Sequence, residues 1–251
     1  LGLGLGPAAT EAVTSATSTT TPVSVVGALG EVDCPAEVLD TVLNRDASET
    51  LRLTVAGAAV DCTAYGRGLL QLALELERPE VALYLARSYS YRSWQLFARN
   101  GTNATALLMA ADLGYAAVVE ELVRNKFIDP LVTEARGNTA LHLAAPYPAA
   151  TAILVNHATD LVSLQLATNV DGDQALHLAL KSGSTQSAST MIDGALLRIS
   201  TRHAAMVATA TDSAGRQPVH LTGDEPLLRL LMRRGARLNI RDGAGALPFP
   251  T

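Results

Sequence analysis

The sequence predicts an all-α solenoid of about six stacked helix–turn–helix repeats joined by short hairpins. Two observations lead to this prediction. One phrase recurs: residues 139–145 read TALHLAA and residues 174–180 read QALHLAL, with further copies at 217–221, 105–111 and 68–74. Each copy also follows a glycine or asparagine at spacings of 37, 34, 35 and 43 residues, namely Gly66, Asn103, Gly137, Gly172 and Gly215. A period in the thirties is typical of a stack of one small unit, and such arrays usually present binding surfaces.

The recurring phrase and its glycine resemble the ankyrin repeat, and so do the junctions between copies. Residues 235–243, GARLNIRDG, are similar to the junction between two such repeats. Residues 57–62, GAAVDC, are similar as well and place one further repeat before Gly66. The composition of residues 1–33 indicates a low-complexity tail or linker, and the resemblance implies an ankyrin-repeat array over 34–251. Its repeats are expected at 35–65, 66–102, 103–136, 137–171, 172–214 and 215–242, with the start of another at 243–251.

Each repeat is expected to contain two short helices. In the first repeat these are 39–43 and 51–53, and in the third the apolar residues at 118–119 and 122–123 follow a break at Gly114. Leucines at i and i+3 or i+4 form the buried stripe of such helices. The glycine before each phrase permits the positive φ that a hairpin tip needs.

Three repeats depart from the pattern. In the fourth, Pro146-Tyr147-Pro148 stands where the first helix should finish, so we expect a short helix there. The 43-residue spacing predicts an insertion within 195–210 of the fifth repeat. The sixth repeat is compressed, because residues 223–226, GDEP, replace a helical turn.

Composition and charge exclude some classes of partner. With 48% hydrophobic but only 4% aromatic residues, the expected core is aliphatic and small. The formal net charge of −5 provides no basic surface, which argues against nucleic acid as the main partner. The most apolar stretch, 51–76, is interrupted by charged residues, so no membrane insertion is expected.

Residues 1–33 differ in character from the repeats. Residues 10–21 are rich in Ser, Thr and Ala, and the first basic residue is Arg45, so the visible N-terminus lacks the basic region of a targeting signal. Two interpretations are open: a flexible tail or linker, and an extended segment that docks on a partner or on the first repeat.

Cys34 and Cys62 are the only cysteines. They could pair in principle, but an array of this kind is expected to keep both reduced in an intracellular location, cytoplasmic or cytoskeletal. Asn100-Gly101-Thr102 and Asn103-Ala104-Thr105 both match the N-glycosylation sequon. The sequons matter only in a secreted chain.

No pattern of catalytic or metal-binding residues emerges. His142, His177 and His220 occupy one fixed position of the repeat. The resemblance implies a structural role, in which each imidazole hydrogen-bonds backbone between neighbouring repeats. No His or Cys spacing suits a metal, residues 2–6 lack the features of a phosphate loop, and there is no nucleophile elbow. We therefore expect no active site, cofactor, metal or small-molecule substrate.

The resemblance implies that partners meet the hairpin tips and first helices, which together form a concave surface, here called the inner face. The hairpin candidates are Tyr65, Arg67, Arg136, Asn138, Asp171, Asp173 and Arg216. The first-helix candidates are Glu75, Asp112, Tyr147 and Lys181. Their mixed charge suits a polar, specific interface, and the alternative is that most are simply solvated.

A second candidate surface, here called the aromatic junction, consists of Tyr89, Tyr91, Trp94 and Phe97. Clustered Tyr and Trp near arginines are typical of a binding hot spot. The alternative is that these rings fill the gap left by a longer loop between repeats.

These features predict a non-catalytic protein–protein interaction scaffold whose partners are other proteins. We expect a subunit of a larger intracellular assembly, axonemal, cytoskeletal or organellar. The alternative is a targeting or regulatory domain of a larger enzyme or channel whose catalytic part lies outside this chain, since the sequence starts without Met and ends just inside a new repeat.

Overall fold

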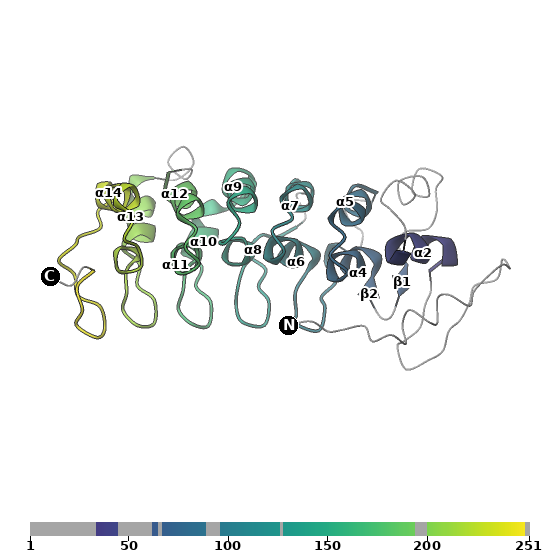
Figure 1. Cartoon of the computed structure of the whole chain (residues 1–251), viewed down its shortest axis with the longest axis horizontal. Coiled ribbons are helices and arrows are strands. Elements are labelled where there is room, and N and C mark those ends of the chain that lie inside the picture. The colour runs from purple at the N-terminus through teal and green to yellow at the C-terminus, as the bar shows by residue number, and fades with distance from the viewer. Residues whose placement is uncertain are drawn as a thin grey trace. The chain divides into compact units, whose positions relative to one another are not determined.

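The computed structural model describes residues 34–44, 62–64, 67–88, 96–125, 128–193 and 200–248. It divides into two compact parts, an N-terminal part up to Ser88 and a C-terminal part from Tyr89. The fold is a mostly helical repeat array, as the recurring phrase predicts (Figure 1). None of the helices described is long and apolar enough to cross a membrane.

The N-terminal part contains three described helices and a short hairpin. Helix α2 (Ala36–Asn44) is followed by the antiparallel strands β1 (Thr63–Ala64) and β2 (Arg67–Gly68), and then by α4 (Leu69–Glu75) and α5 (Pro79–Ser88). Helix α4 packs against both α2 and α5, which explains why six of its seven residues are buried. The second helix predicted for the first repeat, at 51–53, lies outside the described residues.

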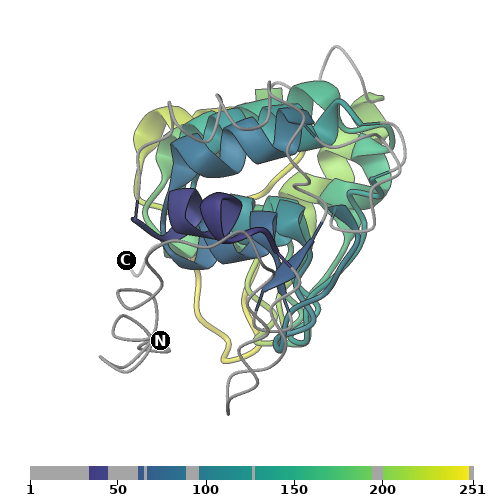
Figure 2. The same ribbon diagram turned by 90° about the vertical axis from the view of Figure 1, so that its right-hand side faces the viewer.

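The C-terminal part is built from helix pairs, one pair per repeat. The pairs are α6 (Ala106–Asp112) with α7 (Ala116–Val123), α8 (Ala140–Leu143) with α9 (Pro148–His157), α11 (Ala175–Lys181) with α12 (Thr185–Asp193), and η3 (Pro218–His220) with α14 (Glu225–Arg233). First helices pack on first helices and second helices on second helices. The result is two layers of helices with the hairpins extending from the first-helix layer (Figure 2).

The predicted departures from the repeat are visible as local structure. Helix α8 is only four residues long, and Pro148 begins the next helix at a position where its missing N–H costs nothing. The insertion predicted within 195–210 contains α13 (Thr201–Thr209). The first helix of the sixth repeat shrinks to the 3₁₀ turn η3.

One helix was not predicted. Helix α10 (Leu161–Leu166) follows α9, and its N-terminus is capped by Asp160, whose Oδ1 accepts a hydrogen bond from the backbone N–H of Ser163 at 3.0 Å. Helix α10 packs against α13, so the fourth and fifth repeats share a third layer of helix.

Leucine and alanine at fixed repeat positions form the core. The leucine of the recurring phrase is fully buried in each complete copy of the C-terminal part, at Leu107, Leu141 and Leu176. The preceding alanines are equally buried, and their small side chains allow the close packing of neighbouring first helices. A polar substitution at the leucine position therefore disturbs two interfaces at once.

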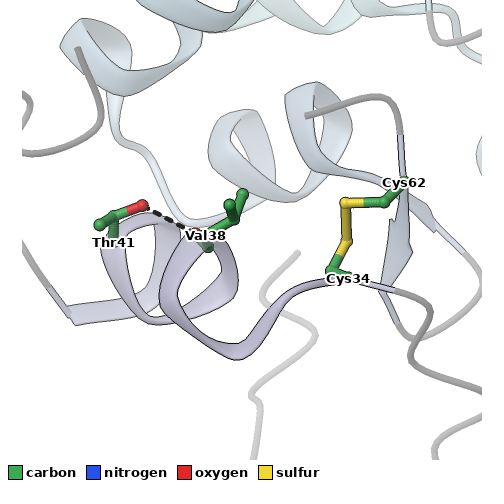
Figure 3. The surroundings of a disulfide bond; sticks show 4 residues. All are labelled: Cys34, Val38, Thr41 and Cys62. Atoms are coloured by element: carbon green, nitrogen blue, oxygen red, sulfur yellow. Dashed lines mark hydrogen bonds between the residues drawn. A yellow bond between two sulfur atoms is a disulfide. The ribbon is translucent and has the colours of Figure 1, made fainter. Parts of the chain in front are cut away.

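The expectation that both cysteines stay reduced is wrong. Cys34 and Cys62 form a disulfide with a Cα–Cα distance of 5.2 Å, between the start of α2 and the start of β1 (Figure 3). Both residues are only 7% exposed. The 28-residue separation in sequence does not predict this pairing. The disulfide depends on the fold placing Cys62, before β1, next to Cys34, before α2.

We expect Leu176→Asp to unfold the C-terminal part under mild conditions, because a carboxylate replaces a side chain that is 1% exposed. The free energy of unfolding should fall by about 4 kcal/mol in denaturant titrations followed by circular dichroism. Val170→Asp, at a side chain that is 69% exposed, is the matched control and should melt like the wild type. A normal melt for Leu176→Asp would refute the repeat register.

We expect reduction of the disulfide to destabilise the N-terminal part by about 3 kcal/mol, since the bond closes a loop of this length in the unfolded chain. Hydrogen exchange should then accelerate in α2 (Ala36–Asn44) while α11 (Ala175–Lys181) keeps its protection. Cys34→Ser with Cys62→Ser should reproduce the effect without reductant. Unchanged protection of α2 after reduction would contradict the assignment.

Candidate protein-binding face

One side-chain acceptor shapes each hairpin of the C-terminal part. Asn169 Oδ1 accepts hydrogen bonds from the backbone N–H groups of Asp171 and Asp173, both at 3.0 Å, and Gly172 between them has φ 73°. An acceptor three residues before a positive-φ residue recurs in every described hairpin of this part, as Asn100 with Asn103, Glu134 with Gly137, Asp212 with Gly215, and Asp242 with Gly245. The tips therefore share one conformation that is independent of any partner.

Successive hairpins are also bonded to one another. The backbone N–H of Val170 donates to the carbonyl of Arg136 at 3.0 Å, and the N–H of Gly243 donates to the carbonyl of Ala214 at 2.9 Å. A Cβ atom on Gly215 would lie 2.7 Å from the Gly243 nitrogen, so this position requires glycine for space as well as for its φ of 72°. The hairpins form a continuous edge with fixed spacing.

The three motif histidines connect the fourth, fifth and sixth repeats to the junctions that follow them. His177 Nδ1 accepts a hydrogen bond from the backbone N–H of Gln174 at 3.1 Å, and its Nε2 lies 3.2 Å from the carbonyl of Ala210 in the following junction. His142 and His220 make the same pair of contacts, with Thr139 and Asp173 and with Gln217 and Ile240. Since a backbone N–H points at Nδ1, the neutral ring carries its proton on Nε2 and donates it to the carbonyl.

Burial determines the protonation state of these rings. It lowers the pKa of both His142 and His177, because the charged imidazolium would lose its hydration, and the surrounding carbonyl and carboxylate groups only partly oppose this. The lowered pKa favours the neutral form of both rings at physiological pH, which suits their hydrogen bonds to backbone.

Four charged residues connect the hairpins of the fifth and sixth repeats. Lys181 Nζ lies 2.5 Å from Asp173 Oδ1 and 3.4 Å from Asp212 Oδ2, and Arg216 Nη2 lies 2.8 Å from Asp212 Oδ2. The side chains of Asp173 and Asp212 are only 5% and 1% exposed. Burial alone would raise the pKa of Asp212, but hydrogen bonds from Arg216 and the charges of Arg216 and Lys181 outweigh it and hold the pKa at about 2.

This network gives three of the predicted partner-binding residues a role inside the fold. Asp173, Lys181 and Arg216 neutralise one another and Asp212 across two repeats. Sequence reasoning assigned them to partner binding and did not single out Asp212, although its position three residues before Gly215 marks it in the sequence. The carboxylates of Asp173 and Asp212 are already paired with Lys181 and Arg216 within the chain.

Other predicted residues of the inner face are exposed. Arg136 Nη2 and Asp171 Oδ2, on successive hairpins, are 3.2 Å apart with side chains 71% and 55% exposed. Asn138 lies behind this pair, where its Oδ1 accepts a hydrogen bond from Asn169 Nδ2 at 2.9 Å. A surface ion pair of this kind stabilises little and so is readily exchanged for contacts with another molecule.

Val170 belongs to the same tip and was missed by the sequence analysis. It is 69% exposed, the highest value among the large hydrophobic residues described. In the sequence, Val170 can be recognised as the one apolar residue in the polar tip 169–173, directly before Asp171.

The remaining first-helix candidates of the C-terminal part, Tyr147 and Asp112, are exposed, although neighbours cover part of each side chain. The ring of Tyr147 is 39% exposed and packs on the preceding repeat, where a Cβ on Gly114 would lie 2.5 Å from a ring carbon. Partial burial, and then the negative charge of Glu134, raises the pKa of Asp112 at the end of α6.

In the N-terminal part, Arg67 and Glu75 form an ion pair with 2.9 Å between Nε and Oε2. Burial raises the pKa of Glu75, and the charge of Arg67 opposes it. Phe97, in the C-terminal part, is 40% exposed and is the one member of the aromatic junction that the structure describes. The other predicted residues lie outside the described residues, namely Tyr65, Tyr89, Tyr91 and Trp94.

Solved structures with the same fold are ankyrin-repeat domains. The ankyrin repeat domain of Bcl-3, a unique member of the IkappaB protein family, superposes with a TM-score of 0.59 at 18% identity over 84% of this chain and 91% of that one. The ankyrin repeat protein EF0377 superposes with a TM-score of 0.50 at 18% identity over 84% of this chain and 87% of that one. No protein-family model and no curated protein matches the sequence.

We expect the array to lose stability as the pH falls below about 6.5. The folded pKa values of His142 and His177 lie below the unfolded value, so their contribution is complete above pH 6.5 and is lost as the unfolded chain takes up protons below it. At pH 5.5 the loss should reach up to about 1.4 kcal/mol for each histidine, measured by denaturant titration. The stability that Asp212 contributes is complete above about pH 3.8 and is lost only as the pH falls from there towards 2, so it is constant over this range.

His177→Gln should flatten the pH dependence between 7.5 and 5.5, because glutamine has no proton to bind. His157→Gln, outside the motif, is the matched control for replacing a histidine with glutamine. A wild-type stability that is constant over this range would show that the buried rings are not neutral contacts.

Proposed function

We propose that this chain, which has the ankyrin-repeat fold, is a non-catalytic scaffold that binds another protein through the inner face of its C-terminal part. The observation that supports this most is the exposed group at the tips of two neighbouring hairpins. Arg136 and Asp171 form a solvent-exposed ion pair, and Val170, the residue before Asp171, is 69% exposed.

Rigidity favours binding at this place. The Asn169 and Glu134 side chains fix the two tips, and the Val170–Arg136 backbone hydrogen bond fixes one tip against the other. A surface whose backbone is already ordered loses little conformational entropy when a partner docks. Its exposed side chains can then supply most of the specific contacts.

The exposed side chains of Arg136, Val170 and Asp171 indicate what kind of surface a partner would need. A protein surface with an apolar side chain to cover Val170 and charges of both signs to pair with Arg136 and Asp171 fits it best. The interface would be polar and specific, which is typical of non-obligate protein complexes. The net charge of −5 favours a protein partner over nucleic acid.

Two contexts for this function follow from the sequence. One is a subunit of a larger assembly, axonemal, cytoskeletal or organellar, and the other is a targeting domain of a larger enzyme or channel. The predicted cytoplasmic or cytoskeletal location depends on reduced cysteines, and the Cys34–Cys62 disulfide removes that premise. Of the contexts named, an organellar one therefore agrees best with the structure.

Charge reversal tests the proposed face directly. We expect the double variant Arg136→Glu with Val170→Ser to lose its co-purifying proteins by at least about tenfold in affinity capture from the native cell extract, because both exposed contacts are removed. Unchanged circular dichroism and melting temperature would show that the fold is intact.

Two further baits locate the contact. Arg229→Glu changes an exposed side chain of α14, in the second-helix layer, and should keep the wild-type set of partners. Phe97→Ala probes the aromatic junction. If the set is lost only with Arg229→Glu or only with Phe97→Ala, the inner face of the C-terminal part is not the binding surface.

A further inference from the structure

Two sequons overlap one hairpin of the C-terminal part. Asn100-Gly101-Thr102 and Asn103-Ala104-Thr105 are adjacent, and none of the other asparagines in the chain is followed by Ser or Thr two residues later. The hairpin is an exposed tip, since Gly101, Thr102 and Asn103 are all exposed. The two possible acceptors therefore sit where an attached oligosaccharide would extend into solvent.

We propose that Asn103 carries an N-linked glycan and that the chain folds in the oxidising compartment where such glycans are added. The disulfide between Cys34 and Cys62 is the independent observation that points to this compartment. Disulfides form and persist in secretory and extracellular environments and are rare in the cytosol. The same compartments attach oligosaccharides to sequons.

The contacts of the hairpin favour Asn103 over Asn100. Asn100 is half-buried, and its Oδ1 accepts hydrogen bonds from the backbone of Thr102 and Ala104 and from the Thr102 hydroxyl, at 3.0, 2.9 and 2.7 Å. Asn103 contributes its backbone to the turn, donating to Asn100 O and accepting from Arg99 Nη1 at 2.8 Å. Its exposed carboxamide can therefore carry a substituent without loss of the turn.

The backbone conformation at position 103 is also compatible with asparagine. Its φ is 65°, the conformation that glycine adopts at Gly137, Gly172, Gly215 and Gly245. Asparagine is among the residues that occupy this region most readily after glycine. This is the one described hairpin of the C-terminal part in which the tip residue has a side chain that can be modified.

The chemical step is transfer of an oligosaccharide from a lipid diphosphate donor by the transferase of that compartment. The Nδ2 atom of Asn103 forms a bond to the anomeric carbon, the bond from that carbon to the diphosphate oxygen breaks, and Nδ2 gives up one proton. The lipid diphosphate leaves. Thr105, which completes the sequon, is only 8% exposed at the start of α6, so the transfer must precede closure of the third repeat.

A glycan at this tip would limit where partners dock. The carbonyl of Thr102 accepts a hydrogen bond from the backbone N–H of Ala135 at 3.1 Å, so the hairpin that contains Asn103 lies beside the one that contains Arg136. The oligosaccharide would therefore extend into solvent from the tip next to Arg136 and restrict how a partner approaches it. Folding in a compartment that adds N-linked glycans differs from the cytoplasmic or cytoskeletal location that the sequence predicts.

The test starts with the protein purified from its own cells, with free thiols alkylated at lysis. Peptide-N-glycosidase treatment in ¹⁸O-water converts a glycosylated asparagine into ¹⁸O-labelled aspartate, which mass spectrometry locates. We expect the label on Asn103 and a linked pair of peptides that contain Cys34 and Cys62. Unlabelled Asn103, a label on Asn100 alone, or alkylated cysteines would overturn the proposal.

Two matched variants give a second measurement in a eukaryotic secretory host. Asn103→Gly removes the proposed acceptor and introduces the residue that the other hairpins use. Asn100→Asp removes the other sequon and introduces the acceptor found at Asp212 and Asp242. We expect Asn100→Asp to keep the glycosidase-sensitive gel shift and Asn103→Gly to lose it. The reverse pattern, or no shift in the wild-type chain, would contradict the assignment.

Discussion

The fourth, fifth and sixth repeats depend on a polar contact between a motif histidine and the backbone of the following junction. A motif histidine uses one ring nitrogen to accept a backbone N–H of its own repeat and the other to reach a carbonyl of the following junction, as His177 does between Gln174 and Ala210. Because a buried carbonyl without a donor is costly, no repeat is complete without its neighbour. Stability is therefore a property of the stack rather than of any single helix pair.

The same constraint determines which side chains remain for recognition. Asp173 and Lys181 are predicted to bind a partner, yet their charges pair with each other and with Asp212 at the junction to the sixth repeat. Arg136 and Asp171 are paired only at the exposed tips, where water competes for both. Burial, rather than position in the repeat, therefore decides whether a charged side chain stabilises the fold or remains exposed for a partner to contact.

Sequence reasoning predicted the fold and its irregularities well, because they depend on local pattern. The period of the motif located the helix pairs, and Pro148 and the long spacing before Gly215 located a short helix and an insertion. It missed the Cys34–Cys62 disulfide and the burial of Asp212, since both depend on how distant segments meet. The aromatic junction stays a prediction, with Phe97 as its described member.

The central claim, that the hairpin edge binds another protein, is tested most directly by photo-crosslinking. A benzophenone amino acid at Val170 would report which molecules touch the exposed tip in the native extract, and the same probe at Arg229 would report on the second-helix layer. We predict crosslinks from position 170 to one defined protein and none to that protein from position 229. Equal labelling from both positions, or labelling from position 229 alone, would contradict the account.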